Sequence, residues 1–334
     1  MGTNTVNPRR RLEISAGLGL LAALVTHAFA VLDTVPRDIA LILRGTRAAL
    51  HGQDPYTTIT GLAYPLPGLI AMAPWSLPPE PAASVLFMFV SATAFAWALM
   101  AEGYAPLLGF FSPGMLFAAQ VGQWSPLFAA ALVIAPLGVF LIVKPHVGIA
   151  TFLARPTWWA AGSAIVCILV AFALQPTWLF DWRASMARGG VHLERAGSGR
   201  YLYAAPVMLP GGVLVLAALS RWRRPEARLL IALSLLPQSL HLYEIVPLAL
   251  IPRGWRESAL YLAGGHLVWW VLREMRPWPI YPEYLLASGT LYTLFVFLPL
   301  TAMVLKRPNV GELPAWLERR LAILPAWLRG TVCG

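Results

Sequence analysis

Charged side chains are scarce in this sequence. Only 12% of its 334 residues are Asp, Glu, Lys or Arg, whereas 58% are hydrophobic. A soluble domain carries about 25% charged residues, so this chain has too few ionic groups to cover the surface of a 36.4 kDa globule. The composition therefore excludes a soluble enzyme with an ordinary polar surface and predicts a polytopic membrane protein.

Cysteine is nearly absent, and carboxylates are dispersed. Cys167 lies within an apolar run and Cys333 is next to last, so we expect no structural disulfide, and neither cysteine has a metal-ligand spacing. The sequence also lacks a clustered carboxylate pair suited to Mg²⁺, so it implies no metal and no other cofactor.

Internal repeats and low-complexity segments are lacking too. We expect one membrane domain over residues 1–305 and a basic cytoplasmic tail over 306–334. From Glu312 to Arg329 this tail mixes Leu and Trp with Arg, a pattern typical of an amphipathic surface helix.

The net charge of +10 does not indicate nucleic-acid binding. The basic residues lie in short loops between apolar runs, where they set membrane topology and meet anionic lipid headgroups. No basic stretch has the interleaved aromatic residues of a nucleic-acid module. We therefore expect membrane lipids, and no nucleic acid, among the partners.

The apolar runs predict an all-α fold with about 9–11 transmembrane or re-entrant helices. The candidate spans are 14–32, 62–77, 82–101, 126–143, 157–175, 201–219, 229–251, 257–272 and 284–305. Two shorter pieces, 106–119 and 146–154, read as re-entrant or broken helices. Dense prolines between residues 105 and 156 favour short, kinked helices there.

Arginines predict the orientation of the chain in a plasma (inner) membrane. Arg9, Arg10 and Arg11 place the N-terminus in the cytoplasm, and the apolar run 14–32 is long enough to be a first span rather than a signal peptide. Pro237 and Pro247 favour a break in segment 229–251, which returns Arg253, Arg256 and the basic tail to the cytoplasm. An unbroken segment would place that tail outside.

This topology leaves segments 33–61, 176–200 and 273–283 outside, with the bend at 238–244 on the same side. Arg183, Arg188, Arg195 and Arg200 then lie where the positive-inside rule does not require them. Either a long loop tolerates the charge, or these arginines face a lipid phosphate at the outer leaflet.

The first external loop predicts an amphipathic helix from Ile39 to His51, ended by Gly52. Its apolar face gathers Ile39, Ile42, Leu43, Thr46 and Leu50, so we expect it to lie along the outer membrane surface. Asp38 stands in its first turn. That carboxylate is either a helix N-cap or a general base held at the membrane boundary.

Several motifs resemble glycosyltransferase family 87, a family of membrane mannosyltransferases with the C-type glycosyltransferase fold. Asp38 precedes Gly52 by 14 residues and Asp54-Pro55-Tyr56 by 16 to 18, which looks like the family spacing. Further similar elements follow downstream: Tyr64-Pro65-Leu66-Pro67, Gly122-Gln123, Lys144-Pro145, and His241 with Tyr243. The resemblance covers residues 30 to 250, and the first-loop block is its most specific part.

The chain also departs from the family pattern. Ile42-Leu43 replaces the tyrosine pair expected after the Asp, and Trp124-Ser125 replaces the Asn expected near Gly-Gln. The stretch from Gln123 to Lys144 and the chain as a whole are short for the family.

The resemblance implies transfer of a hexose, mannose above all, from a polyprenyl-phosphate sugar to a lipid or glycan acceptor at the outer face. Asp38 would be the general base of an inverting reaction, and no metal would be needed. His241 would contact the donor phosphate, with Lys144 and Arg183 as weaker candidates. The remaining substrate-binding candidates are Tyr64, Gln123, Asp54 and Tyr56.

Other interpretations of these residues stay open. Lys144 could mark a cytoplasmic helix end, Gly122 and Gln123 could allow close helix packing, and His241 with Glu244 could form a buried structural pair. Tyr56 and Tyr64 could be interfacial anchors. The protein could also be a polyprenyl-phosphate or lipid carrier or flippase, which would tolerate Asn at position 38, or a non-catalytic family member.

Overall fold

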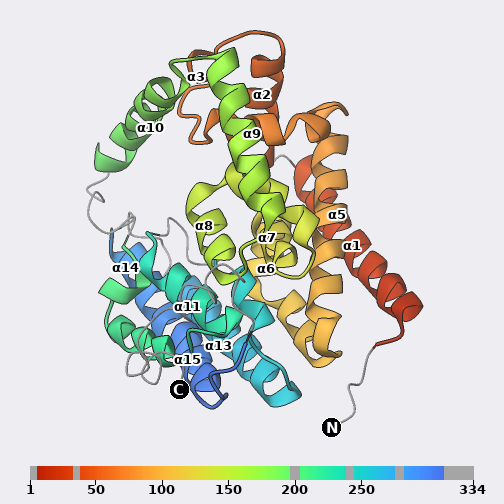
Figure 1. The fold of residues 1–334 in the computed structure, drawn as a ribbon, viewed down its shortest axis with the longest axis vertical. Helices are drawn as coiled ribbons and strands as arrows, with labels where there is room; N and C mark the ends of the chain where they lie inside the picture. Colours follow the sequence, from red (N-terminus) through yellow and green to blue (C-terminus); the bar gives the residue numbers. More distant parts are fainter. Residues whose placement is uncertain (1–5, 33–37, 196–203, 238–243, 275–281, 312–334) are drawn as a thin grey trace, which may run out of the picture.

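The computed structural model describes residues 6–32, 38–195, 204–237, 244–274 and 282–311, and these residues form helices and loops without any strand (Figure 1). The predicted all-α fold is therefore confirmed for the described part of the chain. The predicted amphipathic helix in the tail lies outside it, as does most of segment 273–283.

Two long helices form an antiparallel pair along one side of the molecule. They are α1 (Pro8–Val31) and α5 (Glu80–Leu99). Arg11 near the start of α1 donates to the carbonyl of Trp97 near the end of α5 (3.0 Å from Nε). Between these ends the backbones come very close, because Gly19 lies against Thr93 of α5. Small residues at a helix interface permit such close packing in a membrane.

The outer face of α1 is apolar and open. Leu20, Leu21 and Leu24 are exposed, whereas Ser15, Gly19, Ala22, Ala23 and Thr26 are buried. The small residues thus face protein and the leucines face outward. In water such a face would be costly, so this arrangement suits a helix whose leucines contact lipid.

The middle of the chain is broken into short helices, as its prolines predict. They are η2 (Met100–Glu102), η3 (Ala105–Phe111), α6 (Pro113–Val121), α7 (Ser125–Ala131), η4 (Ala135–Val143) and α8 (Pro145–Ala154). Five of them, η3, α6, α7, η4 and α8, have a proline in the first turn, where its missing N–H costs nothing. The predicted span 126–143 is therefore two pieces instead of one helix.

One end of the molecule gathers the described helices of the predicted external segments 33–61 and 176–200 together with those of the predicted spans 62–77 and 157–175. They comprise α2 (Asp38–Leu50), α3 (Pro55–Thr58), α4 (Leu66–Ala71), η1 (Ala73–Ser76), α9 (Trp158–Leu174) and α10 (Trp178–Arg195). The chain bends by 91° between α9 and α10. Trp182 of α10 then donates to the carbonyl of Ala63 (2.9 Å), which fixes α10 against the first external loop (Figure 1).

The predicted break in segment 229–251 is present. Helix α11 (Pro225–Leu235) ends before Pro237, and η7 (Val246–Leu250) begins at the residue before Pro247. Arg253 forms an ion pair with Glu226 at the start of α11 (2.8 Å), so both ends of the segment lie together. A single unbroken helix over 229–251 is therefore wrong, and the membrane side of the basic tail stays a prediction.

The last described helices pack beside α11. They are η5 (Pro206–Met208), η6 (Gly212–Arg221), α13 (Trp255–Glu274), α14 (Pro282–Tyr292), a π-helical turn (Thr293–Phe297) and α15 (Leu298–Leu305). Gly264 of α13 lies against the carbonyl of Phe295, which brings α13 and the π-helical turn together. The predicted span 201–219 is two short 3₁₀ helices.

Within the described parts of the chain, three helices are long and apolar enough to cross a membrane: Pro8–Val31, Glu80–Glu102 and Leu286–Leu305. A fourth span results if the bent pair α9 and α10 is taken as one. The chain is therefore a membrane protein by helix length and composition. The total of 9–11 transmembrane or re-entrant helices stays a prediction, because several predicted segments, 62–77 among them, fold as shorter pieces.

The close contact of α1 with α5 gives a stability prediction. A Cβ at Gly19 would lie 2.8 Å from the carbonyl oxygen of Phe89, whereas a Cβ at Gly17 has nothing within 4 Å. Gly19→Leu should lower the free energy of unfolding by about 1–3 kcal/mol by overpacking, and Gly17→Leu should not. Thermal unfolding midpoints of the two variants in detergent measure this, and equal midpoints would contradict the packing.

Candidate functional site

Helix α2 presents Asp38 at its first position and buries one face in protein. Of the predicted apolar face, Ile39, Ile42, Leu43 and Thr46 are buried in protein, but Leu50 is 57% exposed. Leu50 is the last residue of the helix, beside the turn at Gly52, and lies beyond the surface that the other four contact.

The predicted placement of α2 along the lipid surface is corrected by its contacts. A Cβ at Gly45 would lie 2.9 Å from Leu62 Cδ2, so the buried face of the helix packs on the segment that leads to α4. On the opposite side Arg44 pairs with Glu80 (2.8 Å), and Arg47 donates to the carbonyl of Pro78 (2.7 Å). Protein contacts on both sides therefore hold Asp38 in place.

Gly122 and Gln123 bring α6 to the start of α2. Gly122 ends α6 with a left-handed backbone (φ 71°), and a Cβ there would lie 2.4 Å from Ile39 Cγ2. Only glycine combines that conformation with that contact at low cost. The next residue, the fully buried Gln123, donates its amide to Asp38 Oδ2. Close packing and a polar contact with Asp38 therefore occur together.

Three ionisable side chains form a buried cluster beside this pair. Lys144 Nζ lies 3.0 Å from Glu244 Oε1, and His146 Nε2 lies 2.8 Å from the same oxygen. Glu244 is 0% exposed and Lys144 is 12% exposed at the side chain. Burial of a carboxylate is tolerable here because two basic groups compensate it.

The cluster acts electrostatically on Asp38. Burial raises the pKa of the Asp38 carboxyl, Lys144 opposes this by favouring the charged form, and the negative charge of Glu244 raises the pKa further. A carboxyl whose pKa is raised by burial is a better proton acceptor than a solvated one. The site therefore contains a half-buried base next to basic groups.

Lys144 lies at the end of the molecule that carries α2. It occupies the N-cap position of α8, and Gly68 of α4 contacts Val143 just before it. The opposite end of α8 leads to Arg155, which the sequence places in the cytoplasm. Lys144 and Arg155 therefore lie at opposite ends of α8, and the membrane side of each end stays a prediction.

Asp54, Tyr56 and Tyr64 form a separate structural group. Asp54 caps α3 by accepting from the backbone N–H of Tyr56 (2.9 Å), and it also accepts from Gln175 after α9 (3.2 Å). The hydroxyl of Tyr56 donates to the carbonyl of Tyr64 (3.2 Å). Both tyrosines are buried, so the alternative of interfacial anchors is wrong.

The predicted phosphate-binding arginines are not gathered at Asp38. Arg183 is exposed on α10 and makes no polar contact with a described residue, whereas Arg188 donates to the carbonyl of Tyr56 (3.0 Å). His241 lies outside the described residues. Of the predicted site residues, Asp38, Gln123 and Lys144 are therefore brought together.

Sequence reasoning missed His146 and the role of Glu244. Glu244 pairs with Lys144 and His146, and the alternative pairing with His241 lies outside the described residues. A carboxylate inside an apolar segment is itself a signal of function, and so is a histidine two residues after a lysine at a helix start. Among the described residues, no group of three His, Cys, Asp or Glu side chains could hold a metal ion.

Comparisons with known proteins give no identification, since no family model, curated protein or solved structure matches the chain.

The contact of Gly122 with Ile39 can be tested against a matched glycine. Gly52 has the same φ of 71°, but a Cβ there meets nothing within 4 Å. Both Gly→Ala variants should lose about 1–2 kcal/mol of stability from the left-handed backbone, and Gly122→Ala should lose more because Ile39 must move. Chemical or thermal unfolding in detergent measures the difference. Equal losses would argue against a tight contact between α6 and α2.

The buried ion pair can be tested with a double-mutant cycle. Glu244→Gln should destabilise the fold by about 3–5 kcal/mol, because it removes one charge of a buried ion pair and keeps the other. Lys144→Met combined with Glu244→Gln should recover part of this loss. The exposed pair of Arg9 and Glu13, 89% and 59% exposed, is the control and should couple by less than about 1 kcal/mol. Similar coupling energies in the two pairs would contradict the assigned burial.

Proposed function

We propose that this chain is a membrane glycosyltransferase of the C-type fold, related to glycosyltransferase family 87. It transfers a hexose, mannose above all, from a polyprenyl-phosphate sugar to a lipid or glycan acceptor at the outer face of the plasma membrane. The observation that carries the proposal is the convergence of Asp38, Gln123 and the Lys144 cluster from segments far apart in the sequence.

Asp38 is the general base in this proposal. Gln123 holds Oδ2 of the carboxylate, which leaves Oδ1 to accept the proton of the acceptor hydroxyl. The acceptor oxygen then forms a bond to the anomeric carbon from the face opposite the phosphate. The bond from that carbon to the phosphate oxygen breaks, its electron pair leaves with the phosphate, and the configuration inverts.

Lys144 and His146 are placed to stabilise the departing phosphate. Negative charge develops on the phosphate oxygen as its bond to the sugar breaks, and a preorganised cation lowers the energy of that state. Glu244 contacts both basic groups and so fixes their positions before substrate binds. His241 and Arg183 keep their proposed roles at the donor phosphate, with Arg183 requiring a movement of its exposed side chain.

A polyprenyl-phosphate carrier or flippase would use similar basic groups but would not need an acid at position 38. A non-catalytic family member would need neither the acid nor its contact with Gln123. Both alternatives differ from a transferase in whether sugar transfer depends on Asp38. This dependence can be measured in detergent micelles, where no substrate has to cross a membrane.

The test is transfer of radiolabelled mannose from polyprenyl-phosphate mannose by the purified chain in detergent micelles. Asp38→Asn should reduce the rate at least about 100-fold, the contribution of a general base. The exposed Glu13→Gln serves as control and should leave the rate unchanged. The wild-type rate should fall as pH decreases through the Asp38 pKa, and this limb should lie above that of a solvated carboxyl because burial raises the pKa.

Two outcomes would overturn the proposal. Transfer that is unaffected by Asp38→Asn would remove Asp38 as the base. Absence of transfer in micelles, with translocation of the lipid in vesicles by wild type and Asp38→Asn alike, would indicate a carrier.

A further inference from the structure

A cavity lies at the end of the molecule opposite Asp38. It has a volume of about 690 Å³, within the usual range for small-molecule sites. Its walls come from the ends of α5, α7 and α8, the start of α11, the residues after η7, and Val310 with Gly311. Helix α8 separates it from the candidate site, because Lys144 precedes this helix and Arg155 follows it.

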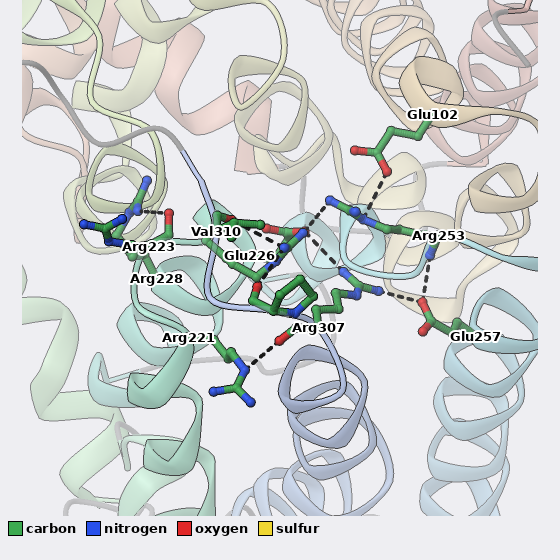
Figure 2. Close-up of polar contacts among 11 residues, drawn as sticks. Glu102, Arg221, Arg223, Glu226, Arg228, Arg253, Glu257, Arg307 and Val310 are labelled. Atoms are coloured by element: carbon green, nitrogen blue, oxygen red, sulfur yellow. Dashed lines mark hydrogen bonds and ion pairs between the residues drawn. The ribbon is translucent and has the colours of Figure 1, made fainter. Parts of the chain in front are cut away.

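Basic groups outnumber acidic groups in the cavity wall. Its basic residues are Arg155, Arg224, Arg228 and Arg253, and its acidic residues are Glu102 and Glu226. Glu226 pairs with Arg224 (3.1 Å), Arg253 (2.8 Å) and Arg307 (3.2 Å), and Figure 2 shows the last two beside it. Arg253 also pairs with Glu102 (3.1 Å) and Arg307 with Glu257 (2.6 Å), so three carboxylates compensate these three arginines, and the positive surplus lies on the two remaining arginines of the wall.

Arg155 and Arg228 carry that surplus. Among the described residues neither has a carboxylate partner. Arg228 donates to the carbonyls of Leu153 and Ala154 at the end of α8 and to those of Trp222 and Arg223 before α11, whereas Arg155 donates, among the described residues, to the carbonyl of Leu132 alone (2.6 Å). A guanidinium has five N–H donors, so most of those on Arg155 are available to a ligand. Arg224 is buried, and its Nε has no partner among the described residues.

The rest of the wall is apolar. Leu99, Leu132, Val133, Leu229 and Ile251 line it beside the arginines. A ligand that matches this wall has an anionic group and a hydrocarbon part. Arginines that only set the membrane topology of a loop do not need to line a cavity. Arginines that only cap helix ends do not need N–H donors beyond those that the helix carbonyls accept.

We propose that this cavity binds an anionic phospholipid, with the phosphate on Arg155 and Arg228 and the start of an acyl chain against the apolar wall. Guanidinium groups bind phosphate oxygens through paired, charge-assisted hydrogen bonds, and basic pockets between membrane helices are suited to such headgroups. The cavity lies on the same side as Arg11 at the start of α1, which the sequence predicts to be the inner leaflet. The proposal does not rest on the proposed sugar transfer.

The experiment is native mass spectrometry of the full chain in detergent with phosphatidylglycerol and phosphatidylcholine of the same acyl chains. Phosphatidylglycerol should bind at least tenfold more tightly than phosphatidylcholine. Arg155→Gln should weaken binding of phosphatidylglycerol by about tenfold to hundredfold, the effect of losing hydrogen bonds between charged groups. Arg10→Gln is the control, because it removes an exposed arginine near the start of α1 and should leave both affinities unchanged.

Three results would overturn the proposal. The first is equal affinity for the two lipids, and the second is a preference for phosphatidylglycerol that Arg155→Gln and Arg10→Gln change equally. The third is full displacement of the lipid by glycerol phosphate at the concentration of the lipid. The last result would indicate a soluble phosphate compound as ligand.

A second variant tests lipid binding in the cavity without changing Arg155. Val133→Phe reduces the space in the cavity from its apolar side and leaves the guanidinium groups in place. It should also weaken binding of phosphatidylglycerol at least tenfold. If Arg155→Gln does not fold, retention of full affinity by Val133→Phe would overturn the proposal.

Discussion

The buried carboxylate of Glu244 is the constraint on which the arrangement around Asp38 depends. A fully buried charge is very costly unless opposite charge lies against it, so Lys144 and His146 must remain within contact distance. Lys144 joins η4 to α8, and the preceding residue, Val143, is packed on Gly68 of α4. The broken segment 229–251, the helices η4 and α8, and helix α4 are thereby held together as one unit.

Broken helices make this unit possible. Backbone that leaves a helix at membrane depth must be covered by protein, and the turn between α6 and α7 meets this condition. Gln123 and Trp124 within it are fully buried, and the Trp124 ring lies 4.5 Å from that of Phe87 on α5. The prolines and Gly122 therefore do more than shorten helices. By ending α6 before Gln123, they let the buried amide of Gln123 donate to the carboxylate of Asp38.

Local patterns in the sequence predicted much of this. The apolar face of α2, the short helices after residue 105 and the break between Pro237 and Pro247 all follow from periodicity and proline placement. The partners of Lys144 could not be predicted, because Glu244 is about 100 residues away in the sequence and only packing joins them. Leu50 and the two tyrosines were misjudged for a related reason. Periodicity gives a face, but what covers that face depends on distant segments such as α4 and α9.

The motif residues of the family resemblance do not all lie at one site in the structure. It singled out Asp38, Gln123 and Lys144, which lie together, but also Asp54, Tyr56 and Tyr64, which hold the external loop together through backbone contacts. Motif residues near one another in sequence thus divide into those at the candidate site and those that support it.

Helix α8 has a consequence for the surrounding bilayer. A helix of ten residues is about 15 Å long, roughly half of a hydrocarbon core of about 30 Å. The ammonium of Lys144 and the guanidinium of Arg155 stand at its two ends. They are closer together than the two faces of an undistorted membrane, so a helix of this length cannot separate the two leaflets by itself. The ion pair of Lys144 with Glu244 shows how a charge at one end of so short a helix is compensated by protein instead of water.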